Sequence, residues 1–384
     1  MTFISLKHKF ILRQNEIYMC GHSLGPLSVN AKLKVESCLQ EWALNAVAGW
    51  VSDDWLNLPK KLGSTIANLI GAEHDEVILA DNTTVNLFKV LHNALAINSC
   101  RKIILMDENE FPTDLYVAQG IAELNKEVVL RTVNSDQIDN ELTEEVAVLL
   151  ISQVNYRTSK VQDLEALITR AHEMGVIVIC DLSHSVGFLP LNCKKLNLDF
   201  AVGCTYKYLN GGPGSPSFIY VNRRFHSQIN SPICGWMGHK NPFEFSQKYA
   251  REVNVNAYLS GTPNILSLKA LEGALEFLNE VDLQMLHQQS AMLADKMIKE
   301  LNNLDSEFTC LSPKKNALRG GHVSFYHENG NNVAKALIQN GIHCDYRDPG
   351  VIRFCVNALY LDEKDIVLAI KKIREVLLKC AVGT

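Results

Sequence analysis

Two short stretches decide the fold of this chain: Cys180-Asp-Leu-Ser-His-Ser-Val-Gly187 and Cys204-Thr-Tyr-Lys-Tyr-Leu-Asn-Gly-Gly-Pro-Gly214. An apolar run directly before the first stretch predicts a buried strand that ends at Asp181. A second apolar segment, Phe200–Gly203, predicts another strand, and Lys207 follows it. The chain therefore sets an acid and a lysine at the ends of consecutive strands.

An acid and a lysine in this arrangement are what pyridoxal 5'-phosphate requires. A buried lysine can hold that cofactor covalently, and an acid can keep a proton on its pyridine nitrogen so that the ring accepts electrons. Taken alone, Asp181 is typical of a turn residue at a strand end, and Lys207 of a solvated loop. Their common position before the glycine-rich Asn210–Gly214 favours a cofactor site.

The composition excludes several classes of protein. With 384 residues, 47% of them hydrophobic and 21% charged, the chain is large enough for two or three globular domains. The net charge of −5 and the lack of a long basic block argue against nucleic acid as a partner. The longest apolar runs, such as Val146–Ile151, are too short to span a membrane. The 11 scattered cysteines, with no Cys-x-x-Cys, predict a reduced, cytoplasmic protein.

Strand and helix patterns alternate through the middle of the chain. Apolar strand patterns lie at 76–80, 102–106, 127–131, 146–152, 176–181 and 217–221, and helical patterns at 84–96, 114–124 and 163–173. This alternation predicts an α/β domain with a mostly parallel sheet between helices.

After about residue 261 the pattern changes to longer helices and short strands, which predicts a smaller α+β domain. We expect three parts: residues 1–45, which pack with the small domain; residues 46–265, the large cofactor-binding domain; and residues 266–384, the small C-terminal domain.

Two further segments are candidates for cofactor contacts. Asp81–Val85 lies between a strand and a helix, where backbone N–H groups and the hydroxyls of Thr83 and Thr84 can meet a phosphate. A Thr-Thr pair before a helix can also be a simple N-cap. Phe111 follows the next strand, and either stacks on the pyridine ring or belongs to the core.

His184 and Arg353 are single residues with two interpretations each. His184 follows Asp181 by three positions and either reaches the ring hydroxyl oxygen or is structural. Arg353 stands in an apolar strand and needs a partner there. That partner is either a substrate carboxylate or a structural ion pair with Asp345 or Asp348. No metal site is expected, because the histidines lack ligand spacing such as His-Glu-x-x-His.

These motifs match a known family. The chain resembles bacterial kynureninase, within the aminotransferase class V group of fold-type I pyridoxal-phosphate enzymes. The motifs that carry the resemblance are Gly21-His-Ser-Leu-Gly25, Trp55–Gly63, Thr84–Phe88, Phe111–Tyr116, Val154–Thr158, Asp181–Gly187, Gly203–Gly214, Gly235-Trp-Met-Gly-His239, Leu259–Pro263 and Pro349–Arg353. The Gly-Trp-Met-Gly-His segment separates this family from desulfurases and transaminases.

The resemblance implies a homodimer and a role for each site residue. Lys207 carries the cofactor, Asp181 pairs with its pyridine nitrogen, Arg353 grips the carboxylate of an amino-acid substrate, and Tyr206 delivers a proton. The other implied cofactor contacts are Phe111 on the ring face, Asp114 beside it, Ser152 and His184 at the ring edge, and Thr83, Thr84, Tyr206, Trp236 and Thr262 at the phosphate, Trp236 and Thr262 from across the dimer.

The implied reaction is hydrolysis of L-kynurenine or 3-hydroxykynurenine at the Cβ–Cγ bond, in tryptophan catabolism. The products are anthranilate or 3-hydroxyanthranilate and L-alanine. Two departures concern the substrate's aromatic end. His22 replaces a family asparagine, and Val47–Trp50 lacks a family arginine. We expect His22, Trp50 and Trp55 to line that end of the pocket.

Three alternatives remain open. A cysteine desulfurase-like lyase needs a mobile, nucleophilic cysteine, for which Cys344 is the candidate, although a strand cysteine is the simpler interpretation. An aminotransferase shares the first steps of the reaction. A non-enzymatic regulator with the same fold usually carries a DNA-binding module, and no helix-turn-helix with a basic face precedes this domain.

Overall fold

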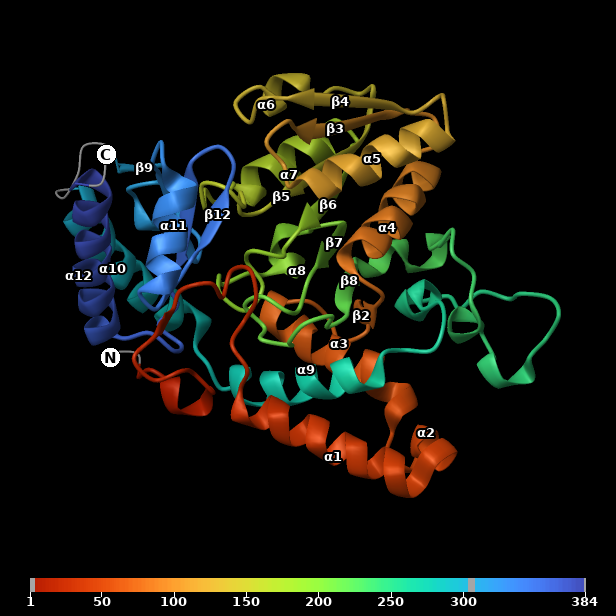
Figure 1. Ribbon diagram of the computed structural model, residues 1–384. Coiled ribbons are helices and arrows are strands. Elements are labelled where there is room, and N and C mark those ends of the chain that lie inside the picture. The colour runs from red at the N-terminus through yellow and green to blue at the C-terminus, as the bar shows by residue number, and fades with distance from the viewer. Residues whose placement is uncertain (1–3, 303–307, 383–384) are drawn as a thin grey trace.

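The computed structural model of the protein describes residues 4–302 and 308–382. A seven-stranded sheet forms its centre, and a smaller sheet lies beside it (Figure 1). The strands of the large sheet, in spatial order, are β2 (Val77–Ala80), β8 (Ser217–Val221), β7 (Phe200–Gly203), β6 (Ile177–Asp181), β5 (Val146–Ser152), β3 (Ile103–Asp107) and β4 (Val129–Val133). Only β8 runs against its neighbours, so the predicted mostly parallel sheet is confirmed.

Helices cover both faces of this sheet. One face packs against α4 (Thr83–Ile97) and α5 (Pro112–Leu124), and the other against α3 (Leu58–Ile70), α7 (Leu164–Glu173) and α9 (Ile265–Leu278). Strand β6 is therefore buried on both sides. Its Ile177 and Ile179 pack on the face covered by α4 and α5, and its Val178 and Cys180 pack on the opposite face. A strand buried on both faces reads as a continuous apolar run, which is why it was predictable.

Local signals set the boundaries of the elements. The α4 helix begins after Asn82, whose side chain accepts a hydrogen bond from the Val85 N–H at 3.0 Å. The predicted strand at 127–131 lies two residues later, because the Asn125 side chain accepts from the Glu127 N–H and holds a turn there.

The C-terminal part contains a four-stranded antiparallel sheet covered by helices. Its strands, in spatial order, are β12 (Asp345–Arg347), β13 (Val351–Cys355), β10 (His322–Tyr326) and β9 (Thr309–Cys310). Its helices are α10 (Leu283–Asn302), α11 (Gly330–Gln339) and α12 (Glu363–Val382). The short helices elsewhere are α2 (Gly49–Ser52), α6 (Ile138–Glu141) and α8 (Cys193–Leu196).

The N-terminal segment contacts both parts. Strand β1 (Ile17–Tyr18) pairs in parallel with β11 (Ile342–His343), and helix α1 (Val29–Asn45) packs along α9 (Figure 1). The domain limits at residues 45 and 265 stay predictions. Within 4–302 and 308–382, no helix combines the length and apolar character needed to cross a bilayer.

Candidate active site

Lys207 lies in the loop after β7, surrounded by groups from other strand ends. Its Nζ atom is 3.1 Å from Nε2 of His184. The ring centroids of Phe111 and Tyr206 lie 5.8 and 5.9 Å from the same Nζ. Phe111 is 38% exposed, so it is not a core residue, and its ring packs edge to face against Tyr156, with centroids 5.2 Å apart.

Asp181 and Ser152 are the last residues of neighbouring strands. They are paired directly across β5 and β6, and both are buried. The backbone N–H of Ser183 donates to Asp181 Oδ1 at 2.6 Å, which fixes the carboxylate at the sheet edge. Ser152 in turn donates its N–H, at 2.8 Å, and its hydroxyl to the side chain of Glu110. Glu110 was missed by the sequence analysis, although a charged residue directly before Phe111 at a strand end was a signal.

Asp114, in the first turn of α5, is a second buried acid near Asp181. It is 1% exposed, and no N–H or hydroxyl donor within the described chain reaches either carboxyl oxygen. Burial raises the pKa of Asp114 well above its usual value, and the neighbouring charges of Asp181 and Glu110 add to that shift. The positive charge of a protonated ring nitrogen would offset this repulsion and supply a donor to the unpartnered oxygens, so these residues suit a pyridinium group.

The turn between β2 and α4 lies where the sequence predicted a phosphate cradle. The Thr83 hydroxyl shares a hydrogen bond with the Ser217 hydroxyl at 3.1 Å, and the Thr84 side chain is exposed. Because Asn82 caps the helix, the two threonine hydroxyls are not consumed as N-caps. The N-terminus of α4 therefore offers N–H groups and hydroxyls to an anion.

An ion pair between a buried lysine and a partly exposed aspartate braces this turn. Lys89, fully buried, pairs with Asp81 and donates to the Tyr258 carbonyl at 2.7 Å. The Ser260 hydroxyl donates to the same carboxylate at 3.1 Å. Asp81 has a left-handed backbone (φ 32°), a conformation that the ion pair helps to hold. The turn after β2 is thus tied to the segment that contains Thr262.

Trp236 and Thr262 lie in the region between β8 and α9. Trp236 is half-buried and packs against the ring of Phe243, with centroids 5.7 Å apart, and Thr262 is exposed. No hydrogen bond or ring contact joins either residue to Lys207 in the described parts of the chain. The Met237 N–H donates to the Ser260 carbonyl at 3.2 Å, which holds the two segments side by side.

Arg353, on β13, has a structural partner. Its Nε donates to Asp345 at 2.7 Å and its Nη2 donates to the other carboxylate oxygen, while Nη1 donates to the Tyr156 carbonyl at 2.5 Å. The ion pair with Asp345 is therefore formed, whereas Asp348 accepts from the Tyr346 hydroxyl instead. These three bonds leave two of the five guanidinium N–H groups for another acceptor, such as a carboxylate.

Three buried histidines lie between Lys207 and this ion pair. His22 is fully buried, its Nε2 atom is 3.2 Å from Asp345, and its ring stacks on His322 at 4.9 Å. The ring of His184 is 5.5 Å from that of His322. Burial lowers the pKa of His22 to about 4 and those of the other two well below the usual value, so all three are neutral near pH 7. His322 was not predicted as a site residue from the sequence.

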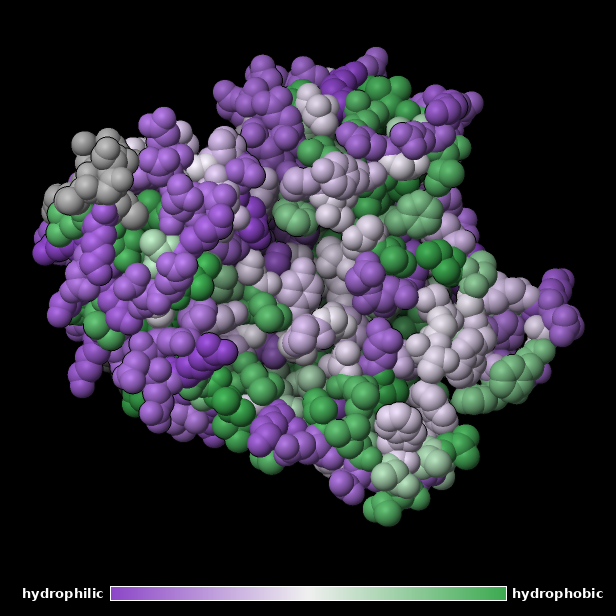
Figure 2. Space-filling view, viewed as in Figure 1, coloured by the Kyte–Doolittle hydropathy of each residue, from purple (hydrophilic) through white to green (hydrophobic). Residues whose placement is uncertain are grey.

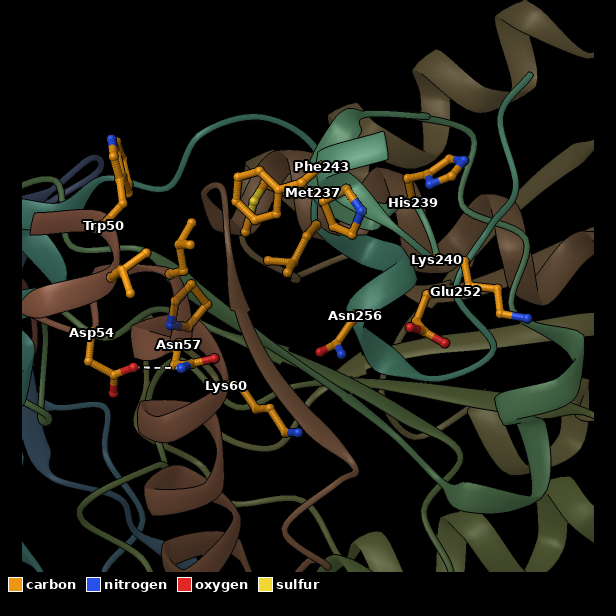
Figure 3. Close-up of a pocket in the computed structure, with 15 residues that line it drawn as sticks. Trp50, Asp54, Asn57, Lys60, Met237, His239, Lys240, Phe243, Glu252 and Asn256 are labelled. Atoms are coloured by element: carbon orange, nitrogen blue, oxygen red, sulfur yellow. Dashed lines mark hydrogen bonds between the residues drawn. The ribbon is translucent and has the colours of Figure 1, made fainter. Parts of the chain in front are cut away.

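Trp50 and Trp55 do not belong to the group of residues around Lys207. Their rings pack edge to face at 5.6 Å, and Trp50 lines a pocket of about 370 Å³ with Met237 and Phe243 (Figure 3). Lys207 does not line this pocket. Within one chain, His22 is therefore not brought together with the two tryptophans.

Two further groups bear on the chemistry. The Cys204 thiol and burial raise the pKa of Tyr206, so its hydroxyl keeps a proton that it can donate.

Cys344 lies between β11 and β12. It is only 4% exposed, and burial raises the pKa of its thiol. A buried, protonated thiol is a poor nucleophile.

Comparison with known proteins decides the family. The aminotransferase class-V family matches residues 57–346. The chain belongs to this family. Among class-V relatives, the kynureninases of Deinococcus radiodurans and Pseudomonas fluorescens are 38% and 36% identical to it over 97% of this chain, and cover 93% and 92% of their own lengths. The chain is thus a kynureninase-like enzyme.

Solved structures confirm the class-V fold, known as fold-type I. A cysteine desulfurase from Thermococcus onnurineus NA1 superposes with a TM-score of 0.83 at 18% identity, covering 98% of this chain and 99% of that one. A mutant of C-DES, described with glycine covalently linked to its pyridoxal-phosphate cofactor, gives 0.84, also at 18%, over 96% and 99% of the two chains. At such identities the likeness concerns the fold alone.

Proposed function

We propose that this class-V enzyme binds pyridoxal 5'-phosphate through Lys207 and hydrolyses the Cβ–Cγ bond of L-kynurenine or 3-hydroxykynurenine. The products are anthranilate or 3-hydroxyanthranilate and L-alanine, as in tryptophan catabolism. The observation that carries the proposal is the similarity to kynureninases over nearly the whole chain. The buried acids beside Lys207 support it, because they suit the cofactor that this chemistry uses.

The residues at the sheet edge hold the cofactor in this proposal. When bound, pyridoxal phosphate supplies an electron sink for the carbanion left when a proton leaves the substrate. Asp181, with Asp114 beside it, holds the proton on the pyridine nitrogen. Phe111 covers one face of the ring, and Ser152 and His184 lie along its edge.

The phosphate is held by the turn after β2. Thr83 and Thr84 contribute hydroxyls and the N-terminus of α4 contributes N–H groups. Tyr206 is a further phosphate contact from the same chain, and Trp236 and Thr262 reach the phosphate from the partner subunit.

Lys207 is also the base that removes the substrate's α-proton. A lysine acts as a base in its neutral form, in which the free amine accepts the proton. The neutral imidazole of His184, whose Nε2 atom is 3.1 Å from the lysine Nζ, orients the amino group through a hydrogen bond. Tyr206, which keeps its own proton, then supplies a proton to Cβ of the departing alanine.

Arg353 orients the substrate. Its two remaining N–H groups bind the α-carboxylate, while Asp345 and the Tyr156 carbonyl fix the plane of the guanidinium. In this proposal Arg353 has two roles, as a structural partner of Asp345 and as a ligand of the substrate.

The runner-up functions fit less well. A desulfurase needs a mobile thiolate, and Cys344 is buried with a raised pKa. The likeness of the chain to a desulfurase is at 18% identity, against 38% to a kynureninase. An aminotransferase shares the cofactor chemistry, but the similarity over the whole chain is to kynureninases.

We further propose a cytoplasmic homodimer. Apolar side chains gather over α1 and α2 at the lower edge of the molecule (Figure 2). Trp42, Leu44, Val47 and Val51 are 58, 81, 80 and 81% exposed. A contiguous exposed apolar face of this kind is typical of a protein–protein interface.

The test compares substrates. The purified enzyme with added cofactor should have the highest kcat/KM for L-kynurenine or 3-hydroxykynurenine, with little sulfide released from L-cysteine. Rapid sulfide release without cleavage of either kynurenine would contradict the proposal.

A further inference from the structure

Glu110 is a buried acid that the proposed reaction does not use. It follows β3, is 6% exposed, and receives two hydrogen bonds from Ser152, one from the N–H at 2.8 Å and one from the hydroxyl. Ser152 is paired with Asp181 across the neighbouring strands. Ser152 therefore links Glu110 to Asp181, the acid that is proposed to hold the proton on the cofactor's pyridine nitrogen.

The surroundings of Glu110 are rich in acids. Asp107, Asp114 and Asp181 are all at least nine-tenths buried. The charges of Asp107 and Asp181 act on Glu110, and the charge of Glu110 acts on Asp114. Asp107 is occupied by the Asn109 N–H, at 2.8 Å, and by the Ser135 hydroxyl. Lys207 is the cation that acts on Asp114.

Burial and neighbouring negative charge both favour the neutral form of a carboxyl group. Burial raises the pKa of Glu110 to about 7, against the opposing effect of the two bonds from Ser152, and Asp107 and Asp181 raise it further. Glu110 therefore changes charge near neutral pH.

We propose that Glu110 is a positioning residue whose charge, held beside Asp181 through Ser152, links cofactor affinity to pH. When Glu110 is ionised, its negative charge favours a protonated nitrogen beside Asp181. When it is neutral, that contribution is absent. This inference rests on the proposed placement of the cofactor nitrogen at Asp181.

The first test uses the protein without cofactor. An acid with a raised pKa binds its proton more tightly in the folded state, so its contribution to stability falls as the pH rises from about 4.5 to about 7. Glu110→Gln keeps the shape and removes the titration. The difference in Tm, variant minus wild type, should become more positive between pH 5 and pH 8. The control Glu108→Gln, an exposed neighbour, should give no such trend.

The second test measures cofactor affinity by quenching of tryptophan fluorescence. The ratio of Kd for Glu110→Gln to Kd for wild type cancels the titration of the cofactor's phosphate and of Lys207. It should be close to one at low pH and rise by about three- to tenfold by pH 8.5. For Glu108→Gln the ratio should stay constant. A pH-independent ratio for Glu110→Gln would overturn the proposal.

Ser152→Ala provides a second variant that keeps the acid. It removes one hydrogen bond to the ionised form of Glu110, which should raise the pKa of Glu110. The pH range over which the Tm difference and the Kd ratio change should therefore move upward. An unchanged pH range would overturn the coupling through Ser152. If wild type does not bind pyridoxal phosphate at all, the proposed function fails as well. The Tm comparison without cofactor distinguishes that failure from a wrong assignment of Glu110.

Discussion

The acids beside Lys207 are the residues on which the proposed chemistry depends most directly. Asp181→Asn keeps the shape of the side chain and its bond from the Ser183 N–H, but it cannot retain a proton on the pyridine nitrogen. We expect the variant to bind the cofactor and to lose roughly 10²–10³-fold in kcat, the usual loss when one preorganised electrostatic contact is removed. Absorbance of bound cofactor and steady-state kinetics measure the two effects. Near-normal turnover would remove Asp181 from this role.

Arg353 permits a test of substrate binding. Arg353→Lys keeps the charge beside Asp345 but loses the planar fork that binds a carboxylate through two N–H groups. We expect kcat/KM to fall about 10- to 100-fold, mainly through KM, since hydrogen bonds to charged groups contribute about 1.5–3 kcal/mol. The exposed Arg374→Lys is the matched control. A change in kcat alone would argue that Arg353 acts only through Asp345.

For single residues, the sequence predicted which side chains lie near Lys207 better than it predicted which neighbours they contact. Lys207, His184 and Phe111 were all expected near one another, and the structure places His184 Nε2 at 3.1 Å and the Phe111 ring centroid at 5.8 Å from the lysine amino group. Glu110 and His322 were not foreseen, because their importance comes from neighbours on other strands rather than from a local pattern. The location of His22 beside Asp345 could not be predicted for the same reason.

The turn between β2 and α4 carries the prediction at the scale of elements. Asp81→Asn would leave the ammonium group of Lys89, fully buried, without its carboxylate. Because the Asp81 side chain is 31% exposed, we expect the loss to be smaller than the roughly 3–5 kcal/mol of a fully buried pair. The result should be a lower Tm and weaker cofactor binding, because this turn contains Thr83. Asp136→Asn, at an exposed position, is the control. Unchanged Tm and affinity would show that the ion pair does not brace the turn.

The elements themselves were largely predictable. Strands buried on both faces, such as β5 and β6, gave continuous apolar runs, and their parallel order followed from the alternation with helices. The direction of β8 was not predictable, because a strand that follows a long loop can enter the sheet either way. Nor did the sequence indicate that β1 would pair with β11, which lies far along the chain.

For the whole molecule, the exposed apolar face predicts a dimer in solution. A Leu44→Lys substitution on α1 places a charge on that face, where Leu44 is 81% exposed. We expect sedimentation to give twice the monomer mass for wild type, and dimer dissociation at about tenfold or more higher concentration for the variant. Leu378→Lys, exposed on α12, should behave like wild type. A fully active wild-type monomer would contradict the shared site.

The most direct test of the whole account is the product balance of a single reaction. The enzyme, loaded with pyridoxal phosphate, is incubated with L-kynurenine, and anthranilate and L-alanine are quantified together. The account predicts that both appear in equal amounts, one of each for every kynurenine consumed, and that Lys207→Ala abolishes their formation. Kynurenine left intact, or consumed without alanine, would contradict it.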